Sequence, residues 1–128
     1  RGAGAVPVTA KMRLGPSLAQ TTAPLVARAA KDNGAVAVTV HGRTADQNYG
    51  EPCHLDRLAE VVDAVSIPVI ANGDIHDAES ALHTLARTGA AGVMVARAAL
   101  TRPWVFREIS AALRGEPIPA APTPEQQR

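Results

Sequence analysis

The chain has 128 residues, 46% of them hydrophobic, which suffices for one domain with a buried core. Its 13 Lys and Arg residues nearly balance 12 Asp and Glu residues, so the formal net charge of +1 leaves no electrostatic footprint for strong nonspecific binding to nucleic acids. The single cysteine, Cys53, excludes an internal disulfide and fits a reducing compartment, while no apolar run approaches the roughly 20 residues of a membrane span.

Four short apolar runs are typical of buried strands in a parallel sheet. Roughly 25–30 residues separate the start of each run from the next, which is the length of a strand, a loop, a helix and a return loop. The runs cover residues 6–10, 36–40, 67–71 and 92–95. This spacing predicts repeated β/α units joined by right-handed crossovers.

Helical stripes of apolar residues fill the intervals between the runs, and capping residues mark their ends. Thr22 is suited to cap the first helix, and Gly34 to end it. A second stripe runs through residues 55–65. Asp77 is typical of the N-cap of a third helix, and Pro103 of the first turn of a last one. The predicted element order is therefore β-α-β-α-β-α-β-α.

This pattern predicts an α/β fold, either a small open sheet or a partial (β/α)8 TIM barrel of about four β/α units, since a closed barrel needs about 250 residues. The chain begins without Met and without a signal peptide, so we expect it to be the interior of a longer protein. Residues 1–115 would form the folded part. Residues 116–128 are polar and contain proline, and we expect them to be disordered.

Polar groups follow each predicted strand, at the end where barrel enzymes carry their chemistry. Lys11 can hold a fixed cation against a delocalised anion such as a reduced flavin, and Arg13 offers a planar donor fork to a base or a phosphate. His41 can donate to a ring or relay a proton. Residues 72–74 and 89–100 follow the last two strands, where barrels frequently bind phosphate. Taken singly, each group also fits ordinary turn chemistry or solvated charge.

In this order the segments resemble the tRNA-dihydrouridine synthase family of flavin-dependent (β/α)8 enzymes. The four matching segments are residues 8–15, 38–44 with Gln47 and Tyr49, 67–75, and 92–100 followed by 102–106. Each match is weak alone, whereas four in register are a specific signal. The resemblance implies that the chain supplies strands 5 to 8, the C-terminal half of an FMN-binding TIM-barrel catalytic domain.

Carried over residue by residue, the resemblance implies a cofactor site and a substrate site. Lys11 and His41 would contact the flavin ring. The ribityl-phosphate would be held by Asn72, Gly73, Asp74, Arg97 and the backbone of Ala96. Arg13 would face the substrate uracil or the RNA, and Arg43 would support the RNA side or the loop. The family's catalytic cysteine lies on the other barrel half, so this chain is assigned no catalytic residue and no metal ligand.

Three departures from the family pattern touch this site. Cys53 does not match the catalytic cysteine and is interpreted as a bystander. Ala96 and Ala98 replace the glycines of the family's usual Gly-Arg-Gly, so their methyl groups would crowd the phosphate or forbid a positive φ. Residues 53–56 replace the family's acidic-aromatic pair, which changes the contacts expected of that loop.

The remaining histidines and large aromatic residues are interpreted as structural. We expect His54, His76 and His83 at surface or loop positions, because they lack metal-ligand spacing. Trp104 and Phe106 are expected to pack against the barrel wall. Stacking of their rings on an RNA base is the alternative.

The resemblance implies reduction of uridine to 5,6-dihydrouridine in tRNA, with FMN as cofactor and NADPH as reductant. The target base would leave its stack to reach the flavin. The isolated chain, without the catalytic cysteine, is expected to be inactive. The full-length protein would have tRNA as its partner, in the cytoplasm and away from membranes.

Two alternatives stay open. Another FMN-dependent barrel oxidoreductase, similar to dihydroorotate dehydrogenase, fits the architecture, although residues 11–13 and 41–44 argue against it. A non-catalytic half-barrel that binds phosphate or a nucleotide also fits. Such a half-barrel would self-associate to cover its two open edge strands.

Overall fold

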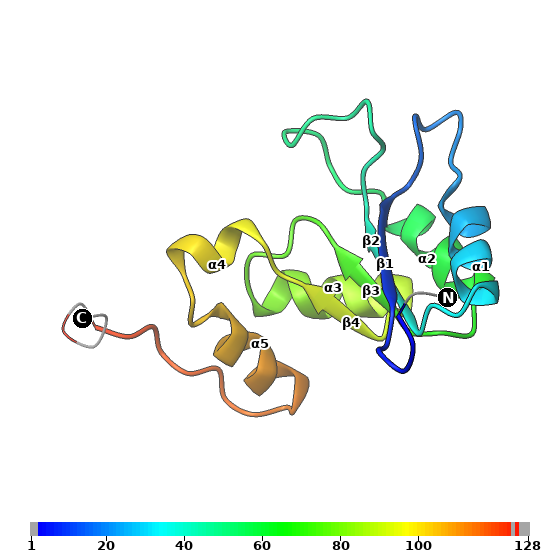
Figure 1. The fold of residues 1–128 in the computed structure, drawn as a ribbon. Helices are drawn as coiled ribbons and strands as arrows, with labels where there is room; N and C mark the ends of the chain where they lie inside the picture. The colour runs from blue at the N-terminus through cyan, green and yellow to red at the C-terminus, as the bar shows by residue number, and fades with distance from the viewer. Residues whose placement is uncertain (1–2, 124, 126–128) are drawn as a thin grey trace.

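In a computed structural model, which describes residues 3–123 and 125, strands and helices alternate along the chain (Figure 1). The strands of this described part form one parallel sheet in the order β1-β2-β3-β4. The elements are β1 (Thr9–Arg13), α1 (Ala23–Asp32), β2 (Ala37–His41), α2 (Leu55–Ala64), β3 (Val69–Asn72), α3 (Ala78–Thr88), β4 (Gly92–Met94), α4 (Arg97–Thr101) and α5 (Val105–Leu113). This architecture confirms the predicted α/β fold with four β/α units of a partial barrel.

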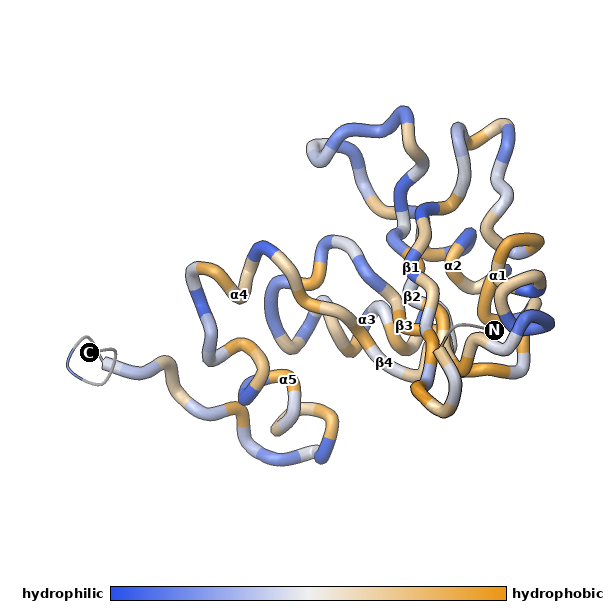
Figure 2. Tube along the Cα trace, viewed as in Figure 1, coloured by the Kyte–Doolittle hydropathy of each residue, from blue (hydrophilic) through white to orange (hydrophobic). Residues whose placement is uncertain are grey.

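The pleat of the sheet separates a helix-facing side from a site-facing side, because successive side chains of a strand point to opposite faces. On the helix-facing side, strand residues Val38, Val40, Val69 and Ala71 form a core with helix residues Ala23, Ala27, Leu58 and Val61. Figure 2 shows hydrophobic residues running through the strands, while the loop between β2 and α2 is largely hydrophilic. Small and β-branched residues fill this core, as expected from an aromatic content of 2%.

A second, smaller core joins the C-terminal helices to the sheet. Val105 and Ile109 of α5 are buried with Ala81 of α3 and Ile75, and Val93 of β4 packs against them. The short helix α4 connects β4 to α5, as Figure 1 shows. This core fixes the position of the segment that follows β4.

Strand β1 begins and ends later in the sequence than predicted. It begins at Thr9 rather than at residue 6 and extends to Arg13. Pairing with β2 runs from Thr9 opposite Ala37 to Arg13 opposite His41, whereas Val6 is 67% exposed. The polar end of the apolar run is therefore part of the strand, and strand geometry orients Lys11 and Arg13.

The capping predictions succeed for α3 and for the end of α1, where Gly34 follows the C-cap with a φ of +93°, and fail in detail for Thr22 and Pro103. Asp77 accepts a hydrogen bond from the backbone N–H of Ser80, and the Ser80 hydroxyl closes a reciprocal capping box. Thr22 precedes α1 but makes no side-chain cap bond. Its backbone N–H donates to the carbonyl of Leu14 instead, at 2.9 Å. Pro103 precedes α5 rather than opening it, because α5 begins at Val105.

The segment after α5 was predicted to be a disordered tail. Its described part has no helix or strand, and the carbonyl of Ala120 accepts a hydrogen bond of 2.9 Å from Arg107 of α5. Residues 124 and 126–128 of the predicted tail lie outside the described residues.

Phe106 was expected to pack against the barrel wall but is 53% exposed. None of the helices in the described part is long and apolar enough to cross a membrane.

Candidate functional site

Strand register lines up four residues across the site-facing side of the sheet. Arg13 of β1 pairs with His41 of β2, His41 with Asn72 of β3, and Asn72 with Met94 of β4. All four line a cavity of about 760 Å³, which falls within the size range of small-molecule sites. The cavity therefore lies at the carboxyl ends of the parallel strands, as predicted.

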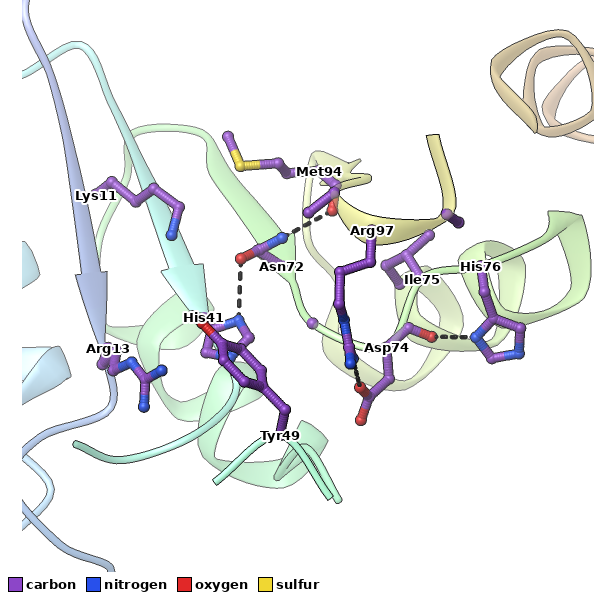
Figure 3. Close-up of a pocket in the computed structure, with 13 residues that line it drawn as sticks. Lys11, Arg13, His41, Tyr49, Asn72, Asp74, Ile75, His76, Met94 and Arg97 are labelled. Atoms are coloured by element: carbon purple, nitrogen blue, oxygen red, sulfur yellow. Dashed lines mark hydrogen bonds and ion pairs between the residues drawn. The ribbon is translucent and has the colours of Figure 1, made fainter. Parts of the chain in front are cut away.

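Most predicted site residues meet at this cavity (Figure 3). Those that line it are Lys11, Arg13, His41, Asn72, Gly73, Asp74, Ala96 and Arg97. Three of them are cations and one is a carboxylate, so the lining has an excess of positive charge. Such a lining favours an anionic ligand.

A chain of hydrogen bonds crosses three strands in the middle of this row. The side-chain amide of Asn72 donates to the carbonyl oxygen of Met94 at 2.9 Å. Its oxygen lies 3.0 Å from Nδ1 of His41. The Nε2 atom of His41 is buried without a hydrogen-bond partner. Burial lowers the pKa of His41, and the cationic charges of Arg13, Arg43 and Lys11 lower it further, against the opposing effect of the Asn72 bond.

The turn after β3 requires a glycine. Gly73 has a φ of +121°, and a Cβ there would collide with Sγ of Cys53. The backbone of the next residue, Asp74, is also in the left-handed region, with a φ of 52°. This tight turn brings the Asp74 carboxylate beside Arg97, which donates to it at 3.4 Å. The sequence identified the turn but not that the side chain of Cys53 packs against it.

Arg43 does not reach the cavity. Its side chain is 2% exposed, and its Nε donates to the carbonyl of Glu51 at 2.6 Å. Its Nη2 donates to the carbonyl of Tyr49 at 3.2 Å and to the carboxylate of Asp74 at 2.7 Å. These contacts favour support of the loop, one of the two roles expected for Arg43, and a side chain this buried is not placed to contact a substrate.

The carboxylate of Asp74 forms ion pairs with Arg43 and Arg97. Burial raises its pKa, but hydrogen bonds from Arg43 and Cys53 outweigh that effect and hold the pKa below its ordinary value. Its charge is therefore balanced within the protein. A second carboxylate or a phosphate would be repelled by it, so its expected direct contact with a phosphate is unfavourable.

Cys53 is a packing residue whose surroundings disfavour the thiolate form. Burial, followed by the nearby charge of Asp74, raises its pKa to about 12. It contacts the positions at which Gly42 and Gly73 lack side chains. That Cys53 is chemically uninvolved stays an interpretation, and its bulk shapes the turn.

Tyr49 is the main lining residue that received no role from the sequence. It is 62% exposed and lies between two guanidinium groups, with Arg97 at 5.2 Å and Arg13 at 5.9 Å from its ring centroid. Its ring also meets His41 edge-on at 6.4 Å. The unusual length of the β2–α2 loop, residues 42–54, was the signal that such a residue existed.

The alanines flanking Arg97 do not occupy left-handed backbone. Ala96 has a φ of −125°, and in the described part of the chain Asp74 is the sole non-glycine residue with a positive φ. Neither alanine therefore adopts the positive φ that a glycine would allow, and the expectation that they forbid it stays a prediction. Crowding by their methyl groups is still expected, since both line the cavity.

Comparison with known proteins identifies relatives of the whole chain. A family profile described as "Dihydrouridine synthase (Dus)" matches residues 1–128. A probable tRNA-dihydrouridine synthase of Mycobacterium leprae is 44% identical over 119 residues, which are 92% of this chain and 31% of that protein. A tRNA-dihydrouridine synthase B of Pseudomonas aeruginosa is 45% identical over 123 residues, or 95% of this chain and 37% of that protein.

Among solved structures, nitroalkane oxidase from Streptomyces ansochromogenes is similar, with a TM-score of 0.50 and 25% sequence identity. The similarity covers 70% of this chain and 26% of that one. The chain thus spans about a third of the length of the curated relatives it matches, at 31% and 37% of the two named above.

Proposed function

The chain belongs to the dihydrouridine synthase family, and from that premise we propose that residues 1–115 supply the C-terminal, FMN-binding half of the barrel of a tRNA-dihydrouridine synthase. The complete protein would reduce uridine to 5,6-dihydrouridine in tRNA, in the cytoplasm, with NADPH as the reductant. The observation that carries this proposal is the cation-lined cavity at the carboxyl ends of four parallel strands.

The residues present fit FMN, which is planar, polar along its edges and anionic at its phosphate. The cavity has the volume of a small-molecule site, and Lys11, Arg13 and Arg97 supply positive charge. The buried, unpartnered Nε2 of His41 is a polar atom that a ligand would satisfy. FMN, when bound, supplies the hydride chemistry, and the protein supplies binding and orientation.

Each residue then has a role that follows from its position. Lys11 would stabilise negative charge on the flavin ring, beside His41. Arg97 would bind the phosphate, together with backbone amides at Gly73 and Ala96. Asp74 would orient Arg97 rather than face the phosphate, because its carboxylate already pairs with Arg97 and Arg43.

Arg13 would face the uracil or the RNA, since it lies in the cavity row and donates to the carbonyl of Thr44 at 2.6 Å with one nitrogen of its fork. The proton donor for the uracil ring would come from the remainder of the protein. The isolated chain would therefore bind flavin without reducing uridine, and self-association through its two sheet edges would compete with completion of the barrel.

The test compares FMN with riboflavin, which lacks the phosphate, by flavin fluorescence titration of the chain. We expect FMN to bind at least about tenfold more tightly, and Arg97→Ala to remove that preference. Arg87→Ala is the matched control, because Arg87 is an exposed arginine on α3 that pairs with Asp56 at 2.7 Å. Equal affinities for both flavins in the unmodified chain would overturn the phosphate site.

A second measurement addresses the complete enzyme. The full-length parent should reduce uridine in tRNA with NADPH and should leave free pyrimidines such as orotate unchanged. Reduction of orotate with no activity on tRNA would favour a dihydroorotate-dehydrogenase-like enzyme. A stable flavin-bound dimer of the isolated chain, with an inactive parent, would favour a non-catalytic half-barrel.

A further inference from the structure

The contacts around His41 determine which of its ring nitrogens carries the proton. The carbonyl oxygen of Met94 can only accept a hydrogen bond, so the Asn72 atom that lies 2.9 Å from it is the amide nitrogen. The Asn72 oxygen therefore faces His41, at 3.0 Å from Nδ1. An amide oxygen can only accept, so Nδ1 of His41 carries a hydrogen.

Whether Nε2, the other ring nitrogen, also carries a proton depends on whether the ring is neutral or positively charged. His41 is 8% exposed, and the cations Lys11, Arg13 and Arg43 act on it from β1 and from the β2–α2 loop. The surroundings disfavour a second proton on the imidazole. Nε2 consequently holds a lone pair, and it is buried with no partner in the protein. A buried acceptor without a donor is unfavourable, and the adjoining cavity is where a donor can enter.

We propose that Asn72 is a positioning residue that holds His41 in the Nδ1–H tautomer, so that Nε2 accepts a hydrogen bond from an O–H or N–H group of the ligand. For the identity of that ligand the inference rests on the proposed function. In oxidised FMN the donors are the imide N–H of the ring and the ribityl hydroxyls, while the ring carbonyls are acceptors. His41 thus selects for a donor group, the opposite of the donation expected from the sequence.

This assignment also changes the role of Asn72. The sequence suggested a direct contact with the ribityl-phosphate. Its amide group instead bridges His41 and Met94, and so connects three strands of the sheet. Asn72 would act on the ligand through the His41 ring, by setting both its rotation and its tautomer.

The first experiment reads the tautomer directly in the flavin-free chain. In a chain labelled with ¹⁵N-histidine, long-range proton–nitrogen spectra distinguish a protonated ring nitrogen from one with a lone pair. We expect protonated Nδ1 and unprotonated Nε2 at neutral pH. A dominant Nε2–H form, or a doubly protonated ring, would overturn the inference without any reference to flavin.

Variants separate positioning from general structural support. Asn72→Asp preserves the size of the side chain and adds a negative charge, which should raise the pKa of His41 and protonate Nε2 at neutral pH. Asn33→Asp is the matched control, since Asn33 is an exposed asparagine whose amide bonds the carbonyl of Ala29. The control should leave the His41 signals unchanged. Identical His41 titrations in Asn72→Asp and the unmodified chain would count against a positioning role.

FMN titration completes the test. Affinity for FMN should fall about tenfold in Asn72→Asp, and should fall in the unmodified chain as pH is lowered through the observed His41 titration. FMN binding that is indifferent to protonation of Nε2 would overturn the acceptor role. If the Nδ1–H tautomer is seen but FMN does not bind at any pH, the proposed function fails while the role of Asn72 stands.

Discussion

At the scale of single residues, Gly73 and Cys53 form one steric unit in the turn after β3. Gly73 has a φ of +121°, a backbone conformation that is costly for a residue with a Cβ, and that Cβ would also collide with Sγ of Cys53. Gly34 separates the two effects, because its φ is +93° and no atom lies within 4 Å of its missing Cβ. Gly73 is thus required both by its backbone conformation and by the space that Cys53 occupies, whereas Gly34 is required by its backbone conformation alone.

We therefore expect Gly73→Ala to lower the free energy of unfolding more than Gly34→Ala does. Backbone strain alone costs about 1–2 kcal/mol, and the collision should add about 1–3 kcal/mol. Urea denaturation measures both variants. In a Cys53→Ala background the collision with Sγ should disappear and only the tight contact of 3.2 Å with the His41 ring should remain, so that the loss for Gly73→Ala approaches the loss for Gly34→Ala. Strictly additive losses for Gly73→Ala and Cys53→Ala would contradict this packing.

At the scale of elements, sequence patterns predicted the strands and helices because each has a local signal. Hydrophobic runs, spacing and the Asp77 cap all follow from residues close together in the chain. Strand β1 was misplaced because its last residues are polar, and pairing with β2 rather than hydrophobicity determines its end. Local patterns contain no information about pairing register.

The candidate site was predicted as a set of residues but not as a set of contacts. Strand order alone brings Lys11, His41 and Asn72 to one edge of the sheet. The sequence left the role of Arg43 open between the RNA side and the loop, because the partners that decide it lie on two separate segments, at Glu51 and at Asp74. Which polar side chain faces a ligand and which is bound within the protein depends on such distant pairings.

Arg43 couples the β2–α2 loop to the turn after β3, and this gives a prediction for the loop as a unit. Arg43→Lys keeps the charge, but its single ammonium nitrogen cannot replace both Nε, which bonds Glu51, and Nη2, which bonds Tyr49 and Asp74. We expect the variant to lose about 2 kcal/mol of stability and hydrogen exchange in the loop to accelerate about tenfold.

Arg57→Lys is the matched control for this variant. Arg57 is exposed on α2 and pairs with Glu60 at 2.6 Å, so its replacement should cost little. Mass spectrometry of peptides covering residues 42–54 measures the exchange. Unchanged protection of this loop in Arg43→Lys would show that the loop holds its position without the arginine.

At the scale of the whole molecule, titrating groups of the site and of the α3 cap divide the pH dependence of stability into two ranges. His41 has a lowered pKa in the folded chain, whereas an unfolded histidine binds a proton near pH 6.5. Asp74 and Asp77 also have lowered pKa values, so their stabilisation is present above the ordinary carboxyl pKa and is lost below it. The first range is near neutrality and the second is acidic.

The near-neutral range gives the more specific prediction. As pH falls below about 6.5, the unfolded state takes up a proton that folded His41 resists, so stability decreases, with a slope of at most about 1.4 kcal/mol per pH unit for one proton. His41→Gln should remove this contribution, and His83→Gln, on the exposed side of α3, controls for the loss of an imidazole. Urea midpoints between pH 7.5 and 5.5 measure the slope. An unmodified chain that becomes more stable over this interval, or a slope that persists in His41→Gln, would mean that the buried ring accepts the proton, and the neutral lone pair on Nε2 would be excluded with it.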